Sequence, residues 1–433
     1  LGQAPVPMIH TPDGGVEQDP EVIWRAVKEA SLMALRGAGV PSERIEAILC
    51  SSQYASTVPI GQDDQPLMNM VMWMDRRGAT AKLKKLPGFP RFNTDPLYLL
   101  PWIYKHGLAP LGTADEALAK IRWIKYARPE VYDRTKVFLE AMDFVNLRLT
   151  GRAAANQCTA LMLYTVDNRR LNQTQHDPLL LRAAGVDREK LPELVPLDAA
   201  VGTLLPAIAE ELGLKAETKV FSGMNDTHAG AMGAGAFGGS HASVSFGSTS
   251  ALATHVGFKR TDILHSLVSI PSPVPDKYFL MGENGVACVA IEHFLSKLIF
   301  ADDQFGALDD AARYEALGRA VMEIAPGADG VLFLPWLAGA IAPINDALIR
   351  GGFLNLGVNT TRSHLARAVM EGVAMNIRWL SHHAERFVGR TFTHFNFHGG
   401  GAQSDVWAQI LADVTQRPVR QLKHPRHIPC VGD

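Results

Sequence analysis

The segment from Phe221 to Val256 most constrains the fold, because two turns rich in small residues interrupt strand-like runs. Asp226 comes after an apolar pair and the flexible dipeptide Ser222-Gly223, so we expect it at the exposed end of a strand. Residues 242–246 alternate small polar and apolar side chains, which is typical of another strand. The residues that break this strand can turn N–H groups and hydroxyls toward an anion; they are Gly247, Ser248, Thr249 and Ser250. The segment therefore predicts a carboxylate base and a phosphate-binding turn in one active site.

Two simpler interpretations of this segment stay open. A Gly-rich turn after a strand often only reverses the chain, and Asp226 could cap the helix that follows it. Neither turn alone specifies a catalytic site, so the rest of the chain must decide.

Further segments follow in an order that matches one known family. The C-terminal half contains GADGVLFLPWLAGAIAP (327–343), a long segment at 350–380 and FHGGGAQSDVWAQILADVTQRPV (397–419). The N-terminal half contains GGVEQDPEVIW (14–24), VMWMDRR (71–77) and MDFVNLRLTG (142–151). Together with NDTHAG and SFGSTS, this order resembles the FGGY family of carbohydrate kinases, which includes xylulokinase and glycerol kinase.

The resemblance implies a fold and a reaction. It implies an α/β fold with two lobes of the actin-like, ribonuclease H-like ATPase type and a cleft between them; periodicity alone indicates only α/β. It also implies ATP and Mg²⁺ as cofactors and transfer of the γ-phosphate to a hydroxyl of a sugar or polyol, in a xylulokinase-like reaction. We place the boundary within the Gly-rich stretch 230–239, so that residues 1–236 form a sugar-binding lobe and 237–433 a nucleotide-binding lobe.

The resemblance also assigns roles to particular residues. Asp226 matches the catalytic base that accepts the proton of the sugar hydroxyl, and Asn225 before it is a candidate substrate contact. The turn Gly247–Ser250 matches a loop for the β- and γ-phosphates. Gly399, Gly400 and Gly401 match the place where the nucleotide lies, with Gln403 near the adenine, although three glycines also fit a tight strand-to-helix turn.

The sugar-binding residues depart from the family pattern. Xylulokinases have Gly-Gln-Met-His-Gly where this chain has Ser52 to Ser56, so only Gln53 is retained. Glycerol kinases have Arg-Glu after that Gln, and here Tyr54 and Ala55 replace the pair, which argues against glycerol. Tyr54 could stack on a sugar. Asp75 and Arg76 match a polar patch near the substrate in relatives, and an ordinary loop role is an equal alternative. Gly339-Ala340-Ile341 stands where the family has Gly-Glu-Arg, which indicates a divergent subgroup.

Local signals predict several helices. Asp19-Pro20 predicts a helix start, and Ser363 is the expected N-cap of a helix that reaches about Phe387. A helical pattern also covers 95–149; its expected core residues are Trp102, Ile121, Trp123, Ile124, Phe138 and Leu139.

The charge balance excludes several classes of partner. The chain has 42 basic and 44 acidic residues, a formal net charge of −2 and no block of Lys or Arg, so we expect no nucleic acid and no membrane surface. No apolar run reaches the ~20 residues that span a bilayer. Neither the four scattered cysteines nor His398 and His382-His383 have metal-ligand spacing, so we expect no metal site of side chains alone. We expect a cytoplasmic enzyme with a small-molecule sugar or polyol substrate, and a homodimer stays open.

The two ends of the sequence leave an alternative function open. Family members begin with a strand and an Asp-x-Gly-Thr phosphate loop and end with a further helix, whereas this sequence starts at Leu1 and stops at Asp433. Either the sequence omits terminal residues or the protein lacks them. In the second case the protein would be an inactive sugar- or nucleotide-binding relative. We favour the kinase, because Asp226 and the later phosphate turn are intact.

Overall fold

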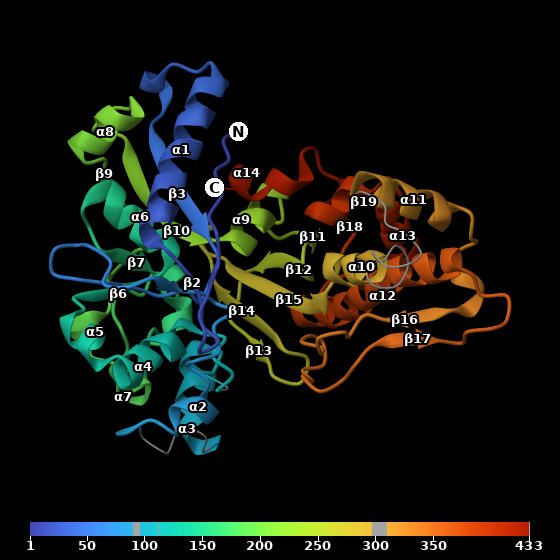
Figure 1. Ribbon diagram of the computed structural model, residues 1–433, viewed down its shortest axis with the longest axis horizontal. Helices are drawn as coiled ribbons and strands as arrows, with labels where there is room; N and C mark the ends of the chain where they lie inside the picture. Colours follow the sequence, from blue (N-terminus) through green and yellow to red (C-terminus); the bar gives the residue numbers. More distant parts are fainter. Residues whose placement is uncertain (90–95, 111, 297–309, 433) are drawn as a thin grey trace. The chain divides into compact units, whose positions relative to one another are not determined.

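The computed structural model describes residues 1–89, 96–110, 112–296 and 310–432, which divide into two compact units (Figure 1). Unit 1 comprises Leu1–Asp226 and Ile270–Lys277, and unit 2 comprises Thr227–Ser269 and Tyr278–Gly432. The predicted lobe boundary after residue 236 stays a prediction.

Unit 1 contains short strands and helices arranged around a three-stranded sheet of order β3-β10-β9. Its strands are β1 (Ile9–His10), β2 (Val16–Gln18), β3 (Ala47–Ser52), β4 (Val58–Ile60), β5 (Met70–Val71), β6 (Val137–Leu139), β7 (Ala154–Asn156), β8 (Glu193–Val195), β9 (Ala200–Thr203) and β10 (Lys219–Asn225). Its helices are α1 (Pro20–Ala38), α2 (Thr80–Leu83), α3 (Pro96–Pro101), α4 (Ala117–Ala127), α5 (Pro129–Arg134), α6 (Ala141–Thr150), α7 (Pro178–Ala184) and α8 (Pro206–Leu212). A second sheet has the order β1-β2-β5.

Helix α1 begins and ends where the sequence predicts. The Asp19 side chain accepts a hydrogen bond from the Glu21 N–H at 2.8 Å, which satisfies one of the donors that a helix leaves unpaired at its start. Gly39 ends the helix in a left-handed conformation, φ 62°, that glycine adopts without strain.

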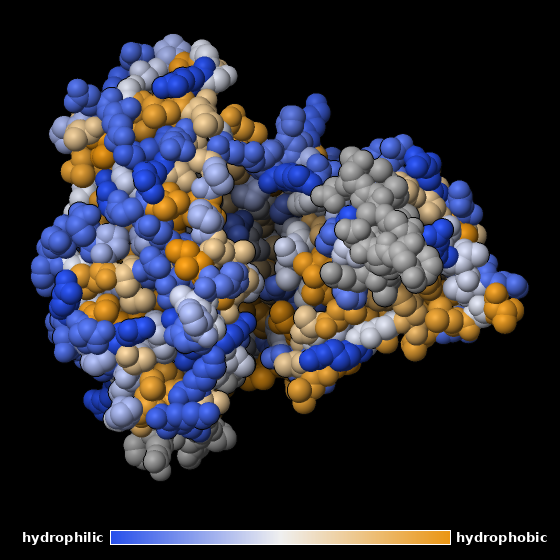
Figure 2. All heavy atoms as spheres, in the orientation of Figure 1, coloured by the Kyte–Doolittle hydropathy of each residue, from blue (hydrophilic) through white to orange (hydrophobic). Residues whose placement is uncertain are grey.

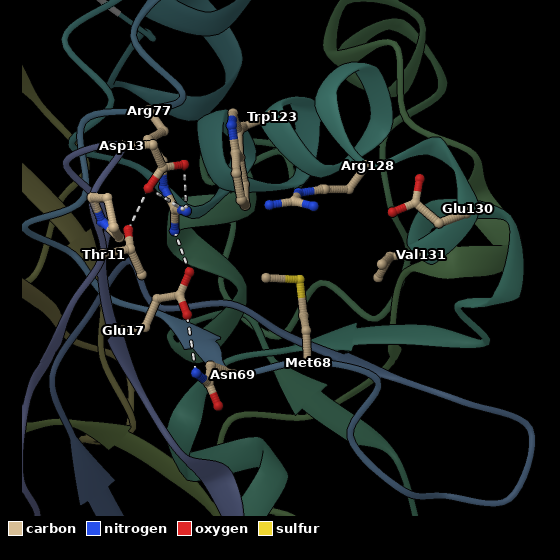
Figure 3. Close-up of a pocket in the computed structure, with 11 residues that line it drawn as sticks. Thr11, Asp13, Glu17, Met68, Asn69, Arg77, Trp123, Arg128, Glu130 and Val131 are labelled. Carbon is tan, nitrogen blue, oxygen red and sulfur yellow. Dashed lines mark hydrogen bonds and ion pairs between the residues drawn. The ribbon is translucent and has the colours of Figure 1, made fainter.

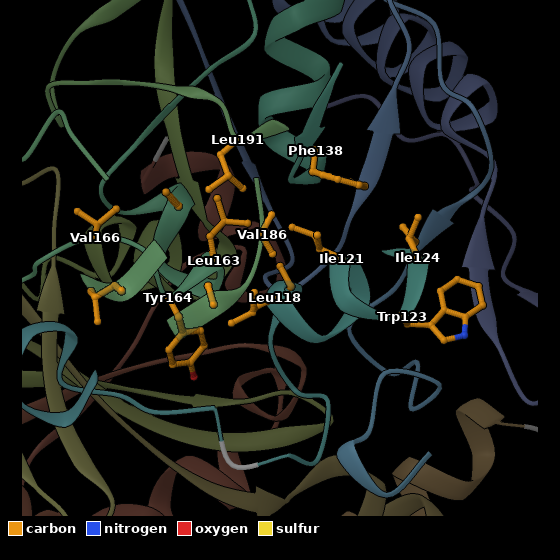
Figure 4. Packing of buried hydrophobic residues seen from close by; sticks show 14 of the residues in the cluster. Leu118, Ile121, Trp123, Ile124, Phe138, Leu163, Tyr164, Val166, Val186 and Leu191 are labelled. Atoms are coloured by element: carbon orange, nitrogen blue, oxygen red, sulfur yellow. The ribbon is translucent and has the colours of Figure 1, made fainter. Parts of the chain in front are cut away.

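A hydrophobic cluster of unit 1 confirms the predicted core residues but corrects one element (Figure 4). Trp102, Ile121 and Ile124 are fully buried. Phe138 and Leu139 are also buried, but they lie in strand β6, so the prediction of a helical pattern over 95–149 is wrong there. Strand β6 has three residues and pairs with β4, and so short a run carries no periodicity that separates strand from helix.

The parallel pair β3 and β10 contains a bulge close to its end. The register shifts between Phe221 and Met224. A Cβ at Gly223 would lie 2.4 Å from the Cys50 carbonyl oxygen, so only glycine fits this close approach of two backbones. Because a bulge redirects the residues that follow it, this one sets the direction in which β10 delivers Asn225 and Asp226.

Unit 2 is built on the sheet that has the order β13-β14-β15-β12-β11-β18-β19. Its strands are β11 (His241–Phe246), β12 (Thr249–Val256), β13 (Thr261–Asp262), β14 (Leu267–Pro271, which runs into the segment of unit 1), β15 (Tyr278–Val286), β16 (Leu332–Leu334), β17 (Gly352–Leu354), β18 (His394–His398) and β19 (Val419–Gln421). Its helices are α9 (Asp226–Gly233), α10 (Cys288–Phe294), α11 (Asp310–Met322), α12 (Arg362–Val388), α13 (Asp405–Thr415) and α14 (Pro429–Gly432). Strands β11, β18 and β19 are parallel, and β12 is antiparallel to both of its neighbours.

Helix α12 starts two residues earlier than predicted. Thr361, not Ser363, is the N-cap, because a capping box with His364 satisfies the first donors of the helix. Thr361 and Ser363 both carry hydroxyls, and the His364 side chain, three residues after Thr361, makes Thr361 the cap. The helix packs against α11, α13 and β16.

The surface carries both hydrophilic and apolar residues. These side chains are interspersed over the visible face (Figure 2). Within the described ranges, no helix combines the length and the apolar character that crossing a bilayer requires.

Candidate active site

The ends of two parallel strands bring together three of the predicted site residues. Ser52 at the end of β3 pairs in register with Asn225 at the end of β10. Gln53 directly follows β3 and Asp226 directly follows β10, so both residues lie at the same edge of the sheet. Asn225 is buried, whereas Asp226 is exposed and is the first residue of α9. Strand ends of this kind are a common place for ligand contacts.

The loop after β3 brings Tyr54 into the same group. Its hydroxyl donates a hydrogen bond to the Cys158 carbonyl oxygen at 3.2 Å. Burial raises the pKa of Tyr54 well above its ordinary value, and the charges near it include that of Asp226. Tyr54 therefore stays a neutral hydrogen-bonding group. Gln53 is held from the other side, since its amide donates to Gln18 at 3.3 Å.

Trp73 is a candidate sugar contact that the sequence reasoning missed. An antiparallel bridge pairs Thr57 with Val71, so the chain segments that carry Tyr54 and Trp73 run beside each other. Trp73 is 44% exposed, which is unusual for the largest apolar side chain. The sequence feature that could have identified it is the position of this tryptophan within the VMWMDRR motif. An exposed aromatic ring on a segment that adjoins the one carrying Tyr54 can stack on the apolar face of a sugar.

Asp75 and Arg76 have other partners in the structure. Asp75 is fully buried, accepts the Val16 N–H at 2.9 Å and forms an ion pair with Arg77 at 2.8 Å. Arg76 is paired with Asp115 near the surface. The structure thus gives both residues structural contacts, which agrees with the loop alternative for them, and a substrate role stays a prediction.

Arg77 organises a cavity of about 660 Å³ in unit 1 (Figure 3). Its guanidinium pairs with Glu17 at 2.6 Å and with Asp13 at 3.2 Å, and it lies 3.9 Å from the centre of the Trp123 ring. Burial alone would lower the pKa of Arg77, but its hydrogen bonds with Asp75 and Glu17 raise that pKa above its ordinary value. This network fixes the β1-β2 hairpin against β5.

The predicted phosphate turn is shorter in the structure than in the sequence analysis. Gly247 and Ser248 connect β11 to β12, whereas Thr249 and Ser250 already belong to β12. Ser250 is buried, Ser248 is exposed and Thr249 is half-buried. The Ser248 and Thr249 hydroxyls are therefore the ones within reach of a ligand. The Ser248 carbonyl oxygen accepts the Ala287 N–H at 2.9 Å, which holds the turn in place.

The three glycines after β18 lie directly beside this turn. Strands β11 and β18 are parallel and pair Ser245 with His398, so Phe246 and Gly399 follow at one edge of the sheet. A Cβ on Gly399 would lie 2.7 Å from the Phe246 carbonyl oxygen, and its φ of 89° also favours glycine. Gly401 is packed as closely, against Phe246 and Trp407. The bare backbone is therefore required for the chain to pass beside the turn.

Gln403 is exposed near these glycines and lies just before helix α13. Residues Gly400–Gln403 form a 3₁₀ turn in which the Gln403 amide donates to the Gly400 carbonyl oxygen at 3.0 Å. Ser404 is the N-cap of α13 and accepts the Trp407 N–H at 3.2 Å. The 3₁₀ turn Gly400–Gln403 therefore connects strand β18 to helix α13.

No metal cluster occurs in the part of the chain that the structure describes. His398 is buried, and burial lowers its pKa to about 4, so it stays neutral at physiological pH. Like the sequence, the structure gives this histidine a packing role, and His382 and His383 join no group of three ligands.

Each α/β unit thus carries candidate site residues at a strand edge, and in unit 2 they lie beside a Gly-rich turn. Family models identify the class of protein: residues 2–233 match the N-terminal domain of the FGGY family of carbohydrate kinases, and residues 242–432 match its C-terminal domain. The chain belongs to the FGGY family of carbohydrate kinases. The expected family and the expected enzyme class, an ATP-dependent carbohydrate kinase, are confirmed.

Individual relatives agree with the family. The chain is 28% identical to a xylulose kinase of Bacillus subtilis over 98% of its own length and 80% of that protein. It is 27% identical to a gluconokinase of the same organism, over 95% of this chain and 77% of that one. The solved structure of a ligand-bound xylulose kinase from Lactobacillus acidophilus matches with a TM-score of 0.82 at 23% identity, covering 99% of this chain and 82% of that chain. The predicted two-domain α/β fold is thereby confirmed.

Proposed function

We propose that this protein transfers the γ-phosphate of ATP to a hydroxyl of an uncharged sugar or polyol, in a xylulokinase-like reaction. The observation that carries the proposal is the placement of Asp226, an exposed carboxylate, beside Gln53 at the end of two parallel strands. A carboxylate there can accept the proton of the attacking hydroxyl, which is otherwise a poor nucleophile.

In this proposal the two units hold one substrate each. Gln53, Tyr54 and Asn225 contact the sugar together with Trp73, and a substrate role of Asp75 and Arg76 stays a prediction. The Gly247–Ser250 segment receives the phosphates of ATP through N–H groups and hydroxyls. Gly399 to Gly401 and Gln403 receive the nucleoside.

The sugar end favours an uncharged substrate over an aldonic acid. The group at the strand ends of unit 1 consists of amides, aromatic rings and the carboxylate of Asp226. A substrate carboxylate placed here would meet the negative charge of Asp226. The xylulose kinase relatives therefore suggest the substrate class better than the gluconokinase relatives do.

Magnesium would enter the site on the phosphates of ATP. Mg²⁺ in kinases keeps several waters and takes one or two carboxylates in addition to phosphate oxygens, so a cage of protein ligands is not needed. This mode of binding is compatible with the described residues, among which no group of three or more His, Cys, Asp or Glu side chains could hold a metal ion. The ion would neutralise phosphate charge during transfer. We assign no residue to it. A cytoplasmic location and a homodimer stay predictions.

The test is a coupled assay of ADP release with ATP and Mg²⁺ over ketoses, aldoses, polyols and D-gluconate. We expect one uncharged sugar to stimulate release, and Asp226→Asn to lower kcat at least ~100-fold, as general-base loss does. Asp198→Asn, a change at another exposed aspartate of unit 1, is the matched control and should keep full activity. If well-folded protein binds sugar or ATP without sugar-stimulated release, the inactive binding relative is the correct description. Turnover of D-gluconate alone would refute the argument about charge.

A further inference from the structure

A buried carboxylate lies beneath the sugar-facing loop of unit 1. Glu140 follows β6 and is only 3% exposed. It occupies the N-cap position of α6, yet its side chain makes no capping hydrogen bond to that helix. Instead its Oε2 accepts the Ser56 N–H at 2.9 Å, across 84 positions of sequence. The carboxylate therefore serves a distant loop and not its own helix.

Glu140 binds a loop whose backbone conformation is strained at Ala55. Ala55 has a φ of 60°, in the left-handed region that non-glycine residues rarely adopt, and it is 2% exposed. The Ser56 N–H, at the residue directly after Ala55, is the group that Glu140 accepts. A buried, strained turn thus depends on one side chain. Gln53 and Tyr54 lie immediately before this turn, so its shape determines where they point.

Lys120 holds the neighbouring segment in the same way. It is 1% exposed, and its ammonium group donates to the Trp73 carbonyl oxygen at 3.3 Å and to the Ala114 carbonyl oxygen. Burial lowers the pKa of Lys120 to about 8, while the charges of Glu116 and Glu140 act to raise it. The two buried groups thus interact and each fixes one of the adjoining segments that carry Tyr54 and Trp73.

We propose that Glu140 is a positioning residue for sugar recognition, which fixes Gln53 and Tyr54 through the Ser56 N–H at the end of the strained Ala55 turn, and that Lys120 supports it by fixing Trp73. The proposal rests on the proposed function in that these segments bind the sugar. Neither residue touches the substrate. Their contribution is to remove the freedom of the loop before the sugar arrives, which lowers the cost of binding.

The choice of test variants follows from the state of the carboxyl group. Burial raises the pKa of Glu140 well above its ordinary value, and the charge of Asp143 adds to that effect. A neutral amide is therefore a close substitute, and Glu140→Gln keeps an oxygen that can accept the Ser56 N–H. Glu140→Leu has a similar size but leaves the Ser56 N–H buried without this acceptor.

The experiment measures steady-state kinetics with the sugar identified by the ADP-release assay. We expect Glu140→Leu to lower kcat/KM for the sugar by ~10-fold or more, as the loss of buried hydrogen bonds predicts, with the KM for ATP unchanged. Glu140→Gln should restore kcat/KM to within about threefold of the wild-type value. Wild-type sugar kinetics in Glu140→Leu, or equal losses in the Gln and Leu variants, would overturn the proposal.

A second readout separates this proposal from the proposed function. Hydrogen exchange of the Ser56 amide needs no turnover, and it should be slow in the wild type and in Glu140→Gln but at least ~10-fold faster in Glu140→Leu. If no sugar is phosphorylated but exchange behaves as expected, the kinase assignment fails and the positioning of the loop stands. If Glu140→Leu does not fold, Lys120→Met decides: it should raise the KM for the sugar and not for ATP, and an unchanged sugar KM would refute the shared role.

Discussion

The close approach of β3 and β10 at Gly223 predicts how a single methyl group affects both stability and catalysis. In Gly223→Ala the new Cβ would lie 2.4 Å from the Cys50 carbonyl oxygen and 3.1 Å from the Met142 side chain. Real Cβ contacts essentially never fall below 3.0 Å, so the strands must separate by at least 0.6 Å. Overpacking of this kind costs ~1–3 kcal/mol. The displaced strand ends carry Gln53 and Asp226, and a misplacement of about 1 Å can lower a rate ~100-fold.

The assay is urea unfolding followed by tryptophan fluorescence, combined with sugar-stimulated ADP release under native conditions. We expect Gly223→Ala to lose ~1–3 kcal/mol of unfolding free energy and ~10- to 100-fold in kcat. Gly37→Ala is the control, because a Cβ there meets nothing within 4 Å and the residue lies in helix α1. That change should be neutral or stabilising by up to ~1 kcal/mol. Unchanged stability and kcat in Gly223→Ala would show that the bulge does not require glycine.

Three further changes test other features. Gly399→Ala should raise the KM for ATP ~10-fold and leave the sugar KM alone, because its Cβ would meet the Phe246 carbonyl oxygen at a strained φ; unaltered ATP kinetics would argue against a nucleotide role. Asp75→Asn should cost about 3 kcal/mol in urea unfolding, since it weakens a buried ion pair, whereas a raised sugar KM at full stability would support the substrate role predicted from sequence. His398→Gln should flatten the pH dependence of Tm. The pKa of His398 is about 4 when folded and 6.5 ordinarily, so its stabilisation is complete above pH 6.5 and is lost as pH falls toward 4; parallel Tm curves for variant and wild type would refute this.

Local chemistry explains what the sequence could predict. The cap at Asp19 and the strand that ends before Asp226 depend on neighbouring residues alone, and both occur in the structure. The Gly-rich segments at 247 and 399 were predicted as turns, and the structure places them side by side because β11 and β18 pair. Their ligands stay predictions, since nothing local distinguishes a loop that binds phosphate from one that only turns.

Partners distant in sequence explain what could not be predicted. Glu140 carries no motif, and its role depends on Ser56 in a loop that only the fold brings near. The hydrogen bond that Asp75 accepts from the Val16 N–H also depends on the fold, and a substrate role of Asp75 stays a prediction. The bulge at Gly223 arises from the pairing of β3 with β10, so the residue pattern of β10 alone does not predict it.

The parallel pairing of β11 with β18 also ties the proposed nucleotide site to the order in which the chain is synthesised. The turn after β11 leaves the ribosome first, and its neighbour Gly399 follows only after α10, α11 and α12. Pairings between distant strands form late, because the intervening chain must first be ordered. A nascent chain that ends before β18 therefore has only half of the proposed nucleotide site. Once β18 has docked, a nucleotide bound in the proposed site would stabilise only the completed unit.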